Sequence, residues 1–352
     1  MAPQTAGELL AAYGPEAGLA PVVAPFARTG SLAERLAVCP FLMAPMAGVT
    51  DGAYRLMARA GGAALAVSEM VSVAGLHYAN EKTWQLVDPL PEEPDIVVQL
   101  FGSEPAQFVE AASAVVERVG DKLVAIDVNM ACPVPKVTRK GEGSALLDAP
   151  RRAAAIIEAC RRGCGERVPV SAKIRIGRRP GEVVGPAFAQ ALEEAGAAAV
   201  AVHGRYASQF YRGESDVAAV ADVVRAVSVP VIASGDALDA ARAAQLKEAT
   251  GAAAVYCARG TYGDPWIFAD AARLLAGEAV GEHGTDERLA AFALHVRLLE
   301  ATGAHLARAR SLAGWYLKGM PEAAAWRERA MHCDTVGDYL ALIDAVRAQG
   351  QS

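Results

Sequence analysis

The chain has 352 residues, 53% of them hydrophobic, and a formal net charge of −6 at pH 7. That length suits one large barrel with a smaller domain, or two to three ordinary domains. The acidic balance excludes a general electrostatic attraction to nucleic acid, so any RNA contact must use a local basic patch.

The six cysteines include no Cys-x-x-Cys pair, so we expect no disulfide framework and a reduced, cytoplasmic setting. Cys160 and Cys164 would share a helix face without nearby partner ligands, which predicts core packing and no metal site. No segment is long and apolar enough to predict a membrane span. The sequence does not fix the oligomeric state, and a monomer is the simplest expectation.

The first 37 residues form a segment rich in Ala, Pro and Gly with weak periodicity. This composition predicts an N-terminal extension with one short helix near residues 8–13. We expect no separate domain and no function of its own for the segment 1–37.

Short apolar runs then recur through the segment 38–276. The eight runs cover residues 38–44, 65–67, 96–98, 124–128, 168–172, 199–202, 230–233 and 253–257. Helical patterns separate most of them. Continuous apolar strands that alternate with helices predict a parallel sheet covered on both faces. Eight such units predict an α/β fold, a (β/α)8 TIM barrel.

Polar or glycine residues follow these runs, and the carboxyl ends of barrel strands converge on the face that carries function. The polar residues at the ends are Glu69, Gln99, Asn129, Lys173, His203, Asp236 and Arg259. The last two loops, residues 234–236 and 258–260, each contain a glycine. Their N–H groups, with Arg259, could bind a phosphate.

Cys132 lies just past the fourth run, directly before Pro133. Lys136, Arg139 and Lys140 follow in the same loop, and cations lower a thiol's pKa or position an anionic substrate near it. A reactive thiol is one interpretation. A small buried hydrophobe before a turn proline is an equally good one at this point.

Beyond a linker at residues 277–284, the segment 285–348 is helical in pattern throughout and predicts a small C-terminal bundle. It contains several cations, Arg310 and Lys318 among them. Acidic residues balance these, so an ordinary solvated surface and a basic stripe both remain open.

Taken together, the motifs at the run ends resemble the tRNA-dihydrouridine synthases, most closely the bacterial B-type branch. The resemblance covers about residues 42–318. Its motifs are APMAGVTD (44–51), SEM (68–70), VQL (98–100), NMACP (129–133), KIR (173–175), HGR (203–205), SGD (234–236), GDPWIF (263–268) and WYLKG (315–319).

The resemblance implies FMN at the barrel mouth, NADPH as reductant, and uridine in tRNA, or in ribosomal RNA, as substrate. It implies cofactor-binding roles for Pro45, Met46, Ala47, Gln99, Lys173, His203, Ser234, Gly235, Asp236, Ala258 and Arg259. It implies that Cys132 is the proton donor, since hydride addition to uracil C6 requires an acid to protonate C5. It further implies RNA or substrate contacts for Asn129, Lys136, Arg139, Lys140, Arg205, Arg310 and Lys318, and an RNA-binding role for the bundle.

Several positions depart from the family's usual pattern. Ala131 stands where Gly is usual, and Ser234 and Ala258 replace Asn and Gly in the expected phosphate loops. Tyr206-Ala207 replaces Thr-Arg, and Ser311-Leu312 replaces Lys-His. Each lost cation is expected to weaken phosphate attraction.

Two other functions remain possible on the sequence. One is an FMN-dependent small-molecule reductase of the dihydroorotate dehydrogenase type, which would need neither the bundle nor the cations of residues 136–140. The other is a catalytically decayed RNA-binding homologue, which the presence of Cys132 and Lys173 disfavours.

Overall fold

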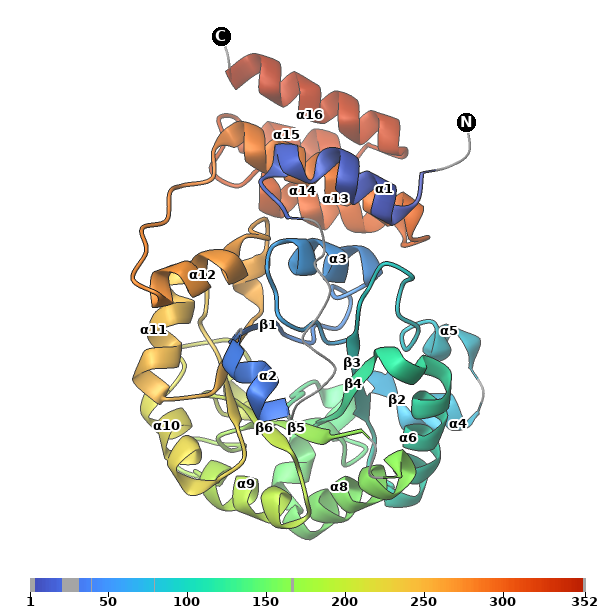
Figure 1. Ribbon diagram of the computed structural model, residues 1–352, viewed down its shortest axis with the longest axis vertical. Coiled ribbons are helices and arrows are strands. Elements are labelled where there is room, and N and C mark those ends of the chain that lie inside the picture. The colour runs from blue at the N-terminus through green and yellow to red at the C-terminus, as the bar shows by residue number, and fades with distance from the viewer. Residues whose placement is uncertain (1–3, 21–31, 39, 79, 166–167, 351–352) are drawn as a thin grey trace.

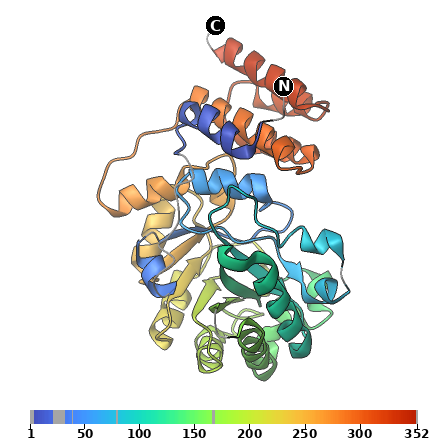
Figure 2. The same cartoon turned by 45° about the vertical axis from the view of Figure 1, so that its right-hand side comes forward.

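The computed structural model describes residues 4–20, 32–38, 40–78, 80–165 and 168–350. Parts of the predicted N-terminal extension, residues 1–3 and 21–31, lie outside the described residues, as does Cys39 in the first apolar run. Figure 1 shows a barrel with a group of helices stacked on one side of it, and Figure 2 shows the same stack from a second direction.

Eight parallel strands form one sheet in the order β1-β8-β7-β6-β5-β4-β3-β2. Their bounds are β1 Phe41–Met43, β2 Val71–Ser72, β3 Ile96–Phe101, β4 Leu123–Asn129, β5 Val170–Arg175, β6 Ala199–His203, β7 Val231–Ser234 and β8 Ala254–Cys257. Nearly all their residues are buried, as expected for strands covered on both faces. The predicted TIM-barrel fold is confirmed.

The predicted second strand, residues 65–67, closes the barrel but is not a regular strand. Ala66 forms a parallel bridge with Met43, and Val67 forms one with Val97. Each residue therefore binds a different neighbour, so no continuous ladder develops on either side. The strand β2 begins four residues later, at Val71, and pairs only with β3.

Helices cover the outside of the barrel. Their bounds are α3 Gly52–Ala60, α4 Val73–His77, α5 Glu81–Trp84, α6 Pro105–Val119, α7 Pro135–Thr138, α8 Pro150–Cys164, α9 Gly185–Glu194, α10 Val217–Ala226, α11 Ala240–Thr250 and α12 Ile267–Leu275. Asp51 caps α3 by accepting a hydrogen bond from the N–H of Tyr54. Cys160 and Cys164 are buried in α8, in accord with core packing.

The C-terminal segment forms the predicted helices. They are α13 Thr285–Ala301, α14 Ala309–Tyr316, α15 Ala323–Ala330 and α16 Val336–Gly350. An aromatic contact joins them to the barrel: Tyr262, after β8, stacks on Trp315 of α14 at 4.0 Å between ring centroids. The helices therefore sit directly beside the end of the last strand.

The start of the N-terminal extension packs on this helical segment, where it forms α1 (Ala6–Tyr13) and the 3-10 turn Pro15–Ala17. A second helix that was not predicted, α2 (Leu32–Val38), buries Leu36 among residues of the barrel. Figures 1 and 2 both show α1 lying along α13. Arg297 of α13 lies over the Tyr13 ring, and Trp266 Nε1 donates to the Ala17 carbonyl at 2.8 Å. The extension thus ties the helical segment to the barrel.

No helix among these residues is long and apolar enough to cross a membrane, and no group of three or more potential ligands among them is placed to hold a metal ion.

Candidate active site

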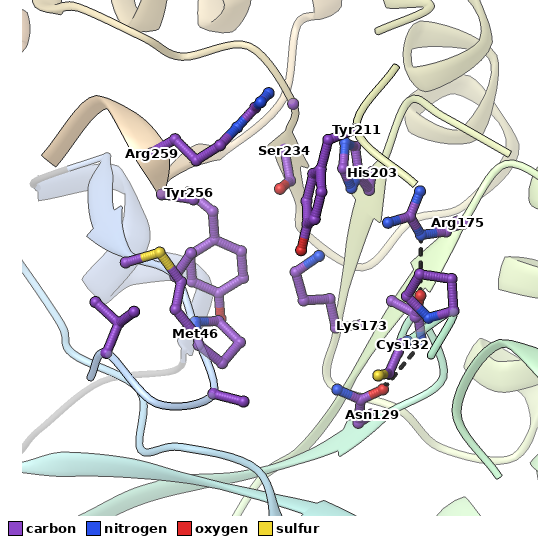
Figure 3. Close-up of a pocket in the computed structure, with 18 of the residues that line it drawn as sticks. Met46, Asn129, Cys132, Lys173, Arg175, His203, Tyr211, Ser234, Tyr256 and Arg259 are labelled. Atoms are coloured by element: carbon purple, nitrogen blue, oxygen red, sulfur yellow. Dashed lines mark hydrogen bonds between the residues drawn. The ribbon is translucent and has the colours of Figure 1, made fainter. Parts of the chain in front are cut away.

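A cavity of about 360 Å³ opens at the carboxyl ends of the strands. In Figure 3, Cys132, Asn129 and Arg175 lie across the cavity from Met46 and Tyr256, and Lys173 points into the space between them. The size falls within the ~300–1,000 Å³ typical of small-molecule sites.

The cavity brings together every position predicted to hold a cofactor. The lining includes Pro45, Met46, Ala47, Gln99, Lys173, His203, Ser234, Gly235, Asp236, Ala258 and Arg259, together with Asn129 and Cys132. These residues come from loops after β1 and from β3 to β8, far apart in sequence. The barrel topology accounts for their convergence.

Neighbouring side chains hold the backbone that carries Cys132. Asn129 Oδ1 accepts hydrogen bonds from the N–H of Ala131 at 3.2 Å and of Cys132 at 2.9 Å. Arg175 Nε donates to the Ala131 carbonyl at 2.9 Å. Ala131 itself has no positive φ, so the methyl group that replaces the usual glycine is compatible with the backbone here.

Burial raises the pKa of the Cys132 thiol, and the N–H of Val134 and the charges of Arg175 and Lys173 oppose this rise only in part. The thiol is therefore protonated at neutral pH. A protonated thiol can donate a proton, whereas a nucleophilic cysteine needs a lowered pKa.

Lys173 is a buried amine with 8% of its surface exposed. Burial, with the neighbouring Arg175, lowers its pKa to about 8, while Asp127 favours the charged form. Lys173 therefore remains largely cationic at pH 7 but titrates within reach of ordinary assays.

Gln99 and Asn129 are linked to each other and to a buried carboxylate that the sequence analysis did not single out. Gln99 Oε1 accepts from Asn129 Nδ2 at 2.9 Å, and Gln99 Nε2 donates to Asp127 Oδ2 at 2.7 Å. Asp127 is fully buried in β4. A signal for it was present, because a charged residue inside an otherwise apolar strand needs specific partners.

The opposite side of the cavity carries an ion-pair cluster. Asp236 accepts from Arg205 at 2.6 Å and from Arg259 at 3.1 Å. Burial and the charges of Lys173 and nearby arginines lower the pKa of His203 well below its usual range, so its ring is neutral.

One prediction on this side needs correction. Arg205 was predicted to contact RNA, but it is 2% exposed and donates to the Arg212 and Gly213 carbonyls as well as to Asp236. The loop after β6 folds back over it and removes it from solvent. The Asp236 carboxylate faces these cations and positions Arg259, while the residue itself lines the cavity as predicted.

Exposed apolar residues surround the cavity mouth, and sequence reasoning missed them. They are Val134 (44% exposed), Phe210 (38%), Tyr211 (58%) and Leu238 (40%). Tyr211 lies against Arg259, with the guanidinium 5.1 Å from the ring centroid. Phe210 has a φ of 54°, an uncommon conformation for a bulky residue that no spacing pattern reveals.

The helical segment contacts the loop after β1 through Arg308, which lies 3.0 Å from Asp51 and 3.1 Å from Glu69. Glu69 Oε2 in turn accepts from the N–H of Gly48 at 2.6 Å. This loop contains Pro45, Met46 and Ala47, so the helical segment helps to position one wall of the cavity.

The remaining predicted RNA contacts lie outside the cavity lining. Lys136, Arg139 and Lys140 are exposed on and after α7, and Lys318 is exposed after α14. Arg310 is exposed and lies 3.8 Å from Asp334. The structure leaves these cations on the surface, where an anionic partner can reach them.

Comparisons with known proteins bear on the identity of this site. Residues 42–349 match the family model described as dihydrouridine synthase. The chain is 38% identical to tRNA-dihydrouridine synthase B of Xanthomonas axonopodis pv. citri (strain 306), over 86% of this chain and 90% of that protein. It is 36% identical to the probable tRNA-dihydrouridine synthase 1 of Synechocystis sp. (strain ATCC 27184 / PCC 6803 / Kazusa), over 86% of this chain and 85% of that one.

The fold is also found in a solved 2-naphthoyl-CoA reductase. That structure aligns with a TM-score of 0.50 at 11% identity, covering 70% of this chain and 53% of that chain. At this identity the likeness shows the fold alone. The family match and the relatives are stronger, and by them this chain belongs to the dihydrouridine synthase family of oxidoreductases.

Proposed function

We propose that this protein is an FMN-dependent tRNA-dihydrouridine synthase. It reduces the C5–C6 bond of uridine in tRNA with NADPH as reductant and Cys132 as proton donor. The observation that supports the proposal is a protonated thiol on a backbone held by Asn129 and Arg175, in the same cavity as the buried Lys173 and the glycine-containing loop at Gly235.

The cavity residues fit FMN. Arg259 is partly exposed beside the loop after β7, and Asp236 fixes it. The N–H groups of Gly235 and Asp236 donate to no other described residue, which leaves them free for a phosphate. Pro45, Met46 and Ala47 provide an apolar wall for a flat ring system. Gln99 and Lys173 supply polar contacts to its edge.

Bound FMN would supply hydride to C6 of the uracil ring. Hydride addition leaves negative charge at C5 and O4, and the Cys132 thiol donates the proton that C5 then requires. Lys173 provides a cation in a site of low water content, where it stabilises negative charge more strongly than in bulk water. The His203 ring is neutral, so it adds no second positive charge beside Lys173.

The RNA must present its uridine extruded, because a base stacked within RNA cannot reach the cavity. The exposed cations Lys136, Arg139, Lys140 and Lys318 can hold the RNA backbone. Tyr211 and Phe210 offer aromatic surface at the mouth. The substrate is thus expected to be a flexible, single-stranded part of the tRNA.

Digestion and mass spectrometry of total RNA from a deletion strain tests the proposal. Loss of dihydrouridine at a defined tRNA position, restored by a plasmid copy, is the expected result. Purified protein should also release FMN on denaturation. A protein that binds flavin and oxidises NADPH, but reduces no uridine in tRNA or ribosomal RNA, would point to a small-molecule reductase instead.

A further inference from the structure

The registry of three strands places a buried carboxylate beneath the cavity. Asp127 of β4 pairs with Gln99 of β3 on one side and with Ser171 of β5 on the other. Residues in register point to the same face, and residues two apart on a strand share that face. Asp127 therefore lies one layer below Asn129 and Lys173 on the interior of the barrel.

Asp127 accepts every hydrogen bond that the structure shows for its side chain, and this determines how the neighbouring amides are oriented. Its oxygens accept from Gln99 Nε2 and from Ser171 Oγ, each at 2.7 Å. A carboxylate can only accept, so Gln99 must turn its amide nitrogen toward Asp127 and its oxygen toward Asn129. Asn129 then donates to that oxygen and is left with its own oxygen facing the N–H groups of Ala131 and Cys132.

We propose that Asp127 is a positioning residue, whose carboxylate fixes the orientation of the Gln99 and Asn129 amides and, through them, the backbone that carries Cys132. Without it, either amide could rotate and present N–H groups to the N–H groups of the Cys132 loop. The assignment of Cys132 as proton donor rests on the proposed function, but the mechanical link from Asp127 to Cys132 does not.

Burial of Asp127 works against the ionised form of its carboxyl group. Burial raises the pKa of its carboxyl, and the hydrogen bonds from Gln99 and Ser171 and the charge of Lys173 offset this only in part. The ionised carboxylate is therefore less stable in the folded state than in the unfolded chain, which lowers the free energy of unfolding at neutral pH. An asparagine could keep the acceptor for Gln99, and the Ser171 hydroxyl could rotate to accept from its amide. Asp127→Asn should thus keep the orientation of the amides and lower the thermal stability little or not at all.

Alkylation of Cys132 by iodoacetamide in the purified full-length protein tests the link without RNA or reductant. Peptide mapping by mass spectrometry separates Cys132 from the partly exposed Cys333, which serves as an internal reference. Asp127→Ala should raise the Cys132 rate about fivefold, as expected for loss of one orienting hydrogen bond, and leave Cys333 unchanged. Asp127→Asn should stay within about twofold of the wild type. Both variants remove the charge, so their difference reports the hydrogen bonds.

Gln99→Met breaks the hydrogen-bonded chain between Asp127 and Asn129 at its middle residue. It should raise the Cys132 alkylation rate as Asp127→Ala does, and it tests the proposal even if Asp127→Ala fails to fold. Equal rates in the Ala and Asn variants would overturn the proposal, as would a wild-type rate in Gln99→Met. On tRNA, kcat should fall in Asp127→Ala and Gln99→Met and stay near the wild-type value in Asp127→Asn, with the KM for tRNA unchanged. If the alkylation results hold but the wild type reduces no tRNA uridine, the positioning role stands and the proposed function fails.

Discussion

The floor and the rim of the cavity differ in burial and in how their side chains are connected. The floor, comprising Gln99, Asn129, Lys173 and the underlying Asp127, is almost wholly buried, and its carboxyl and amide groups are joined in one hydrogen-bonded chain. The rim comprises Val134, Phe210 and Tyr211 at the mouth, with the cations Lys136, Arg139 and Lys140 that follow Val134 outside the cavity lining, and all of these are exposed.

This difference separates chemistry from recognition. Buried polar groups must each have partners, so a change at the floor disturbs several residues together. Exposed cations act through long-range charge and contribute nearly independently. We therefore expect floor variants to lose turnover and rim variants to lose RNA affinity.

The largest effect is expected at Cys132. Cys132→Ala should keep flavin binding and flavin reduction by NADPH, because the residue is held by backbone contacts that alanine preserves. Removal of the proton donor should slow turnover on tRNA by about 10²- to 10⁴-fold. Single-turnover reduction of a tRNA transcript, followed by mass spectrometry, measures the loss. Unchanged turnover would rule out the proton-donor role.

Lys173→Met should lower kcat by about 10²-fold or more through loss of a buried charge-stabilising cation. It should also raise Tm at pH 7. The folded-state pKa of Lys173 is about 8, below the ~10.4 of an unfolded chain, so the unfolded state binds more protons between these values. The stability of the wild type therefore rises as the pH increases between the two pKa values. The gain in Tm of Lys173→Met over the wild type is largest below pH 8, where the folded wild type holds a buried charge.

Thermal scans from neutral to alkaline pH check this, with Lys136→Met as the exposed control. A lower Tm for Lys173→Met than for the wild type at pH 7 would contradict this. It would show that the contacts of the charged amine in the folded state outweigh the cost of its burial.

Substitution of the rim cations should weaken RNA binding with little change in turnover at saturation. The triple variant Lys136→Ala, Arg139→Ala, Lys140→Ala should lower the slope of log K against log salt by about 2 to 3. Filter binding of tRNA at several salt concentrations measures this. The double variant Arg225→Ala, Arg242→Ala removes exposed cations from α10 and α11 and should behave as wild type; an equal loss there would assign the effect to overall charge.

The smallest effect is expected where the helical segment meets the barrel. Arg308→Ala removes two partly exposed ion pairs and should cost about 0.5–1 kcal/mol, a shift of a few degrees or less in Tm. Because Glu69 also holds the N–H of Gly48, flavin retention during gel filtration should weaken slightly. Arg310→Ala, whose partner Asp334 is exposed, is the matched control, and identical behaviour of the two variants would argue against the link.

The apolar runs predicted most of the barrel because strands covered on both faces must be continuously apolar. The polar residues at the strand ends predicted the cavity lining for the same topological reason. The direction of the chain from Asp127 to Cys132 could not be predicted, since it depends on the registry of β3, β4 and β5. The burial of Arg205 was missed because the loop after β6 folds back through a positive φ at Phe210, which no periodicity encodes.

The central claim is most directly tested by one turnover in the absence of excess reductant. Protein carrying FMN is reduced with NADPH, freed of nucleotide, and mixed with an unmodified tRNA transcript. The account predicts that the flavin is reoxidised while one uridine gains two hydrogens. In Cys132→Ala both events should be much slower than in the wild type. Reoxidation that leaves every uridine unchanged would contradict it.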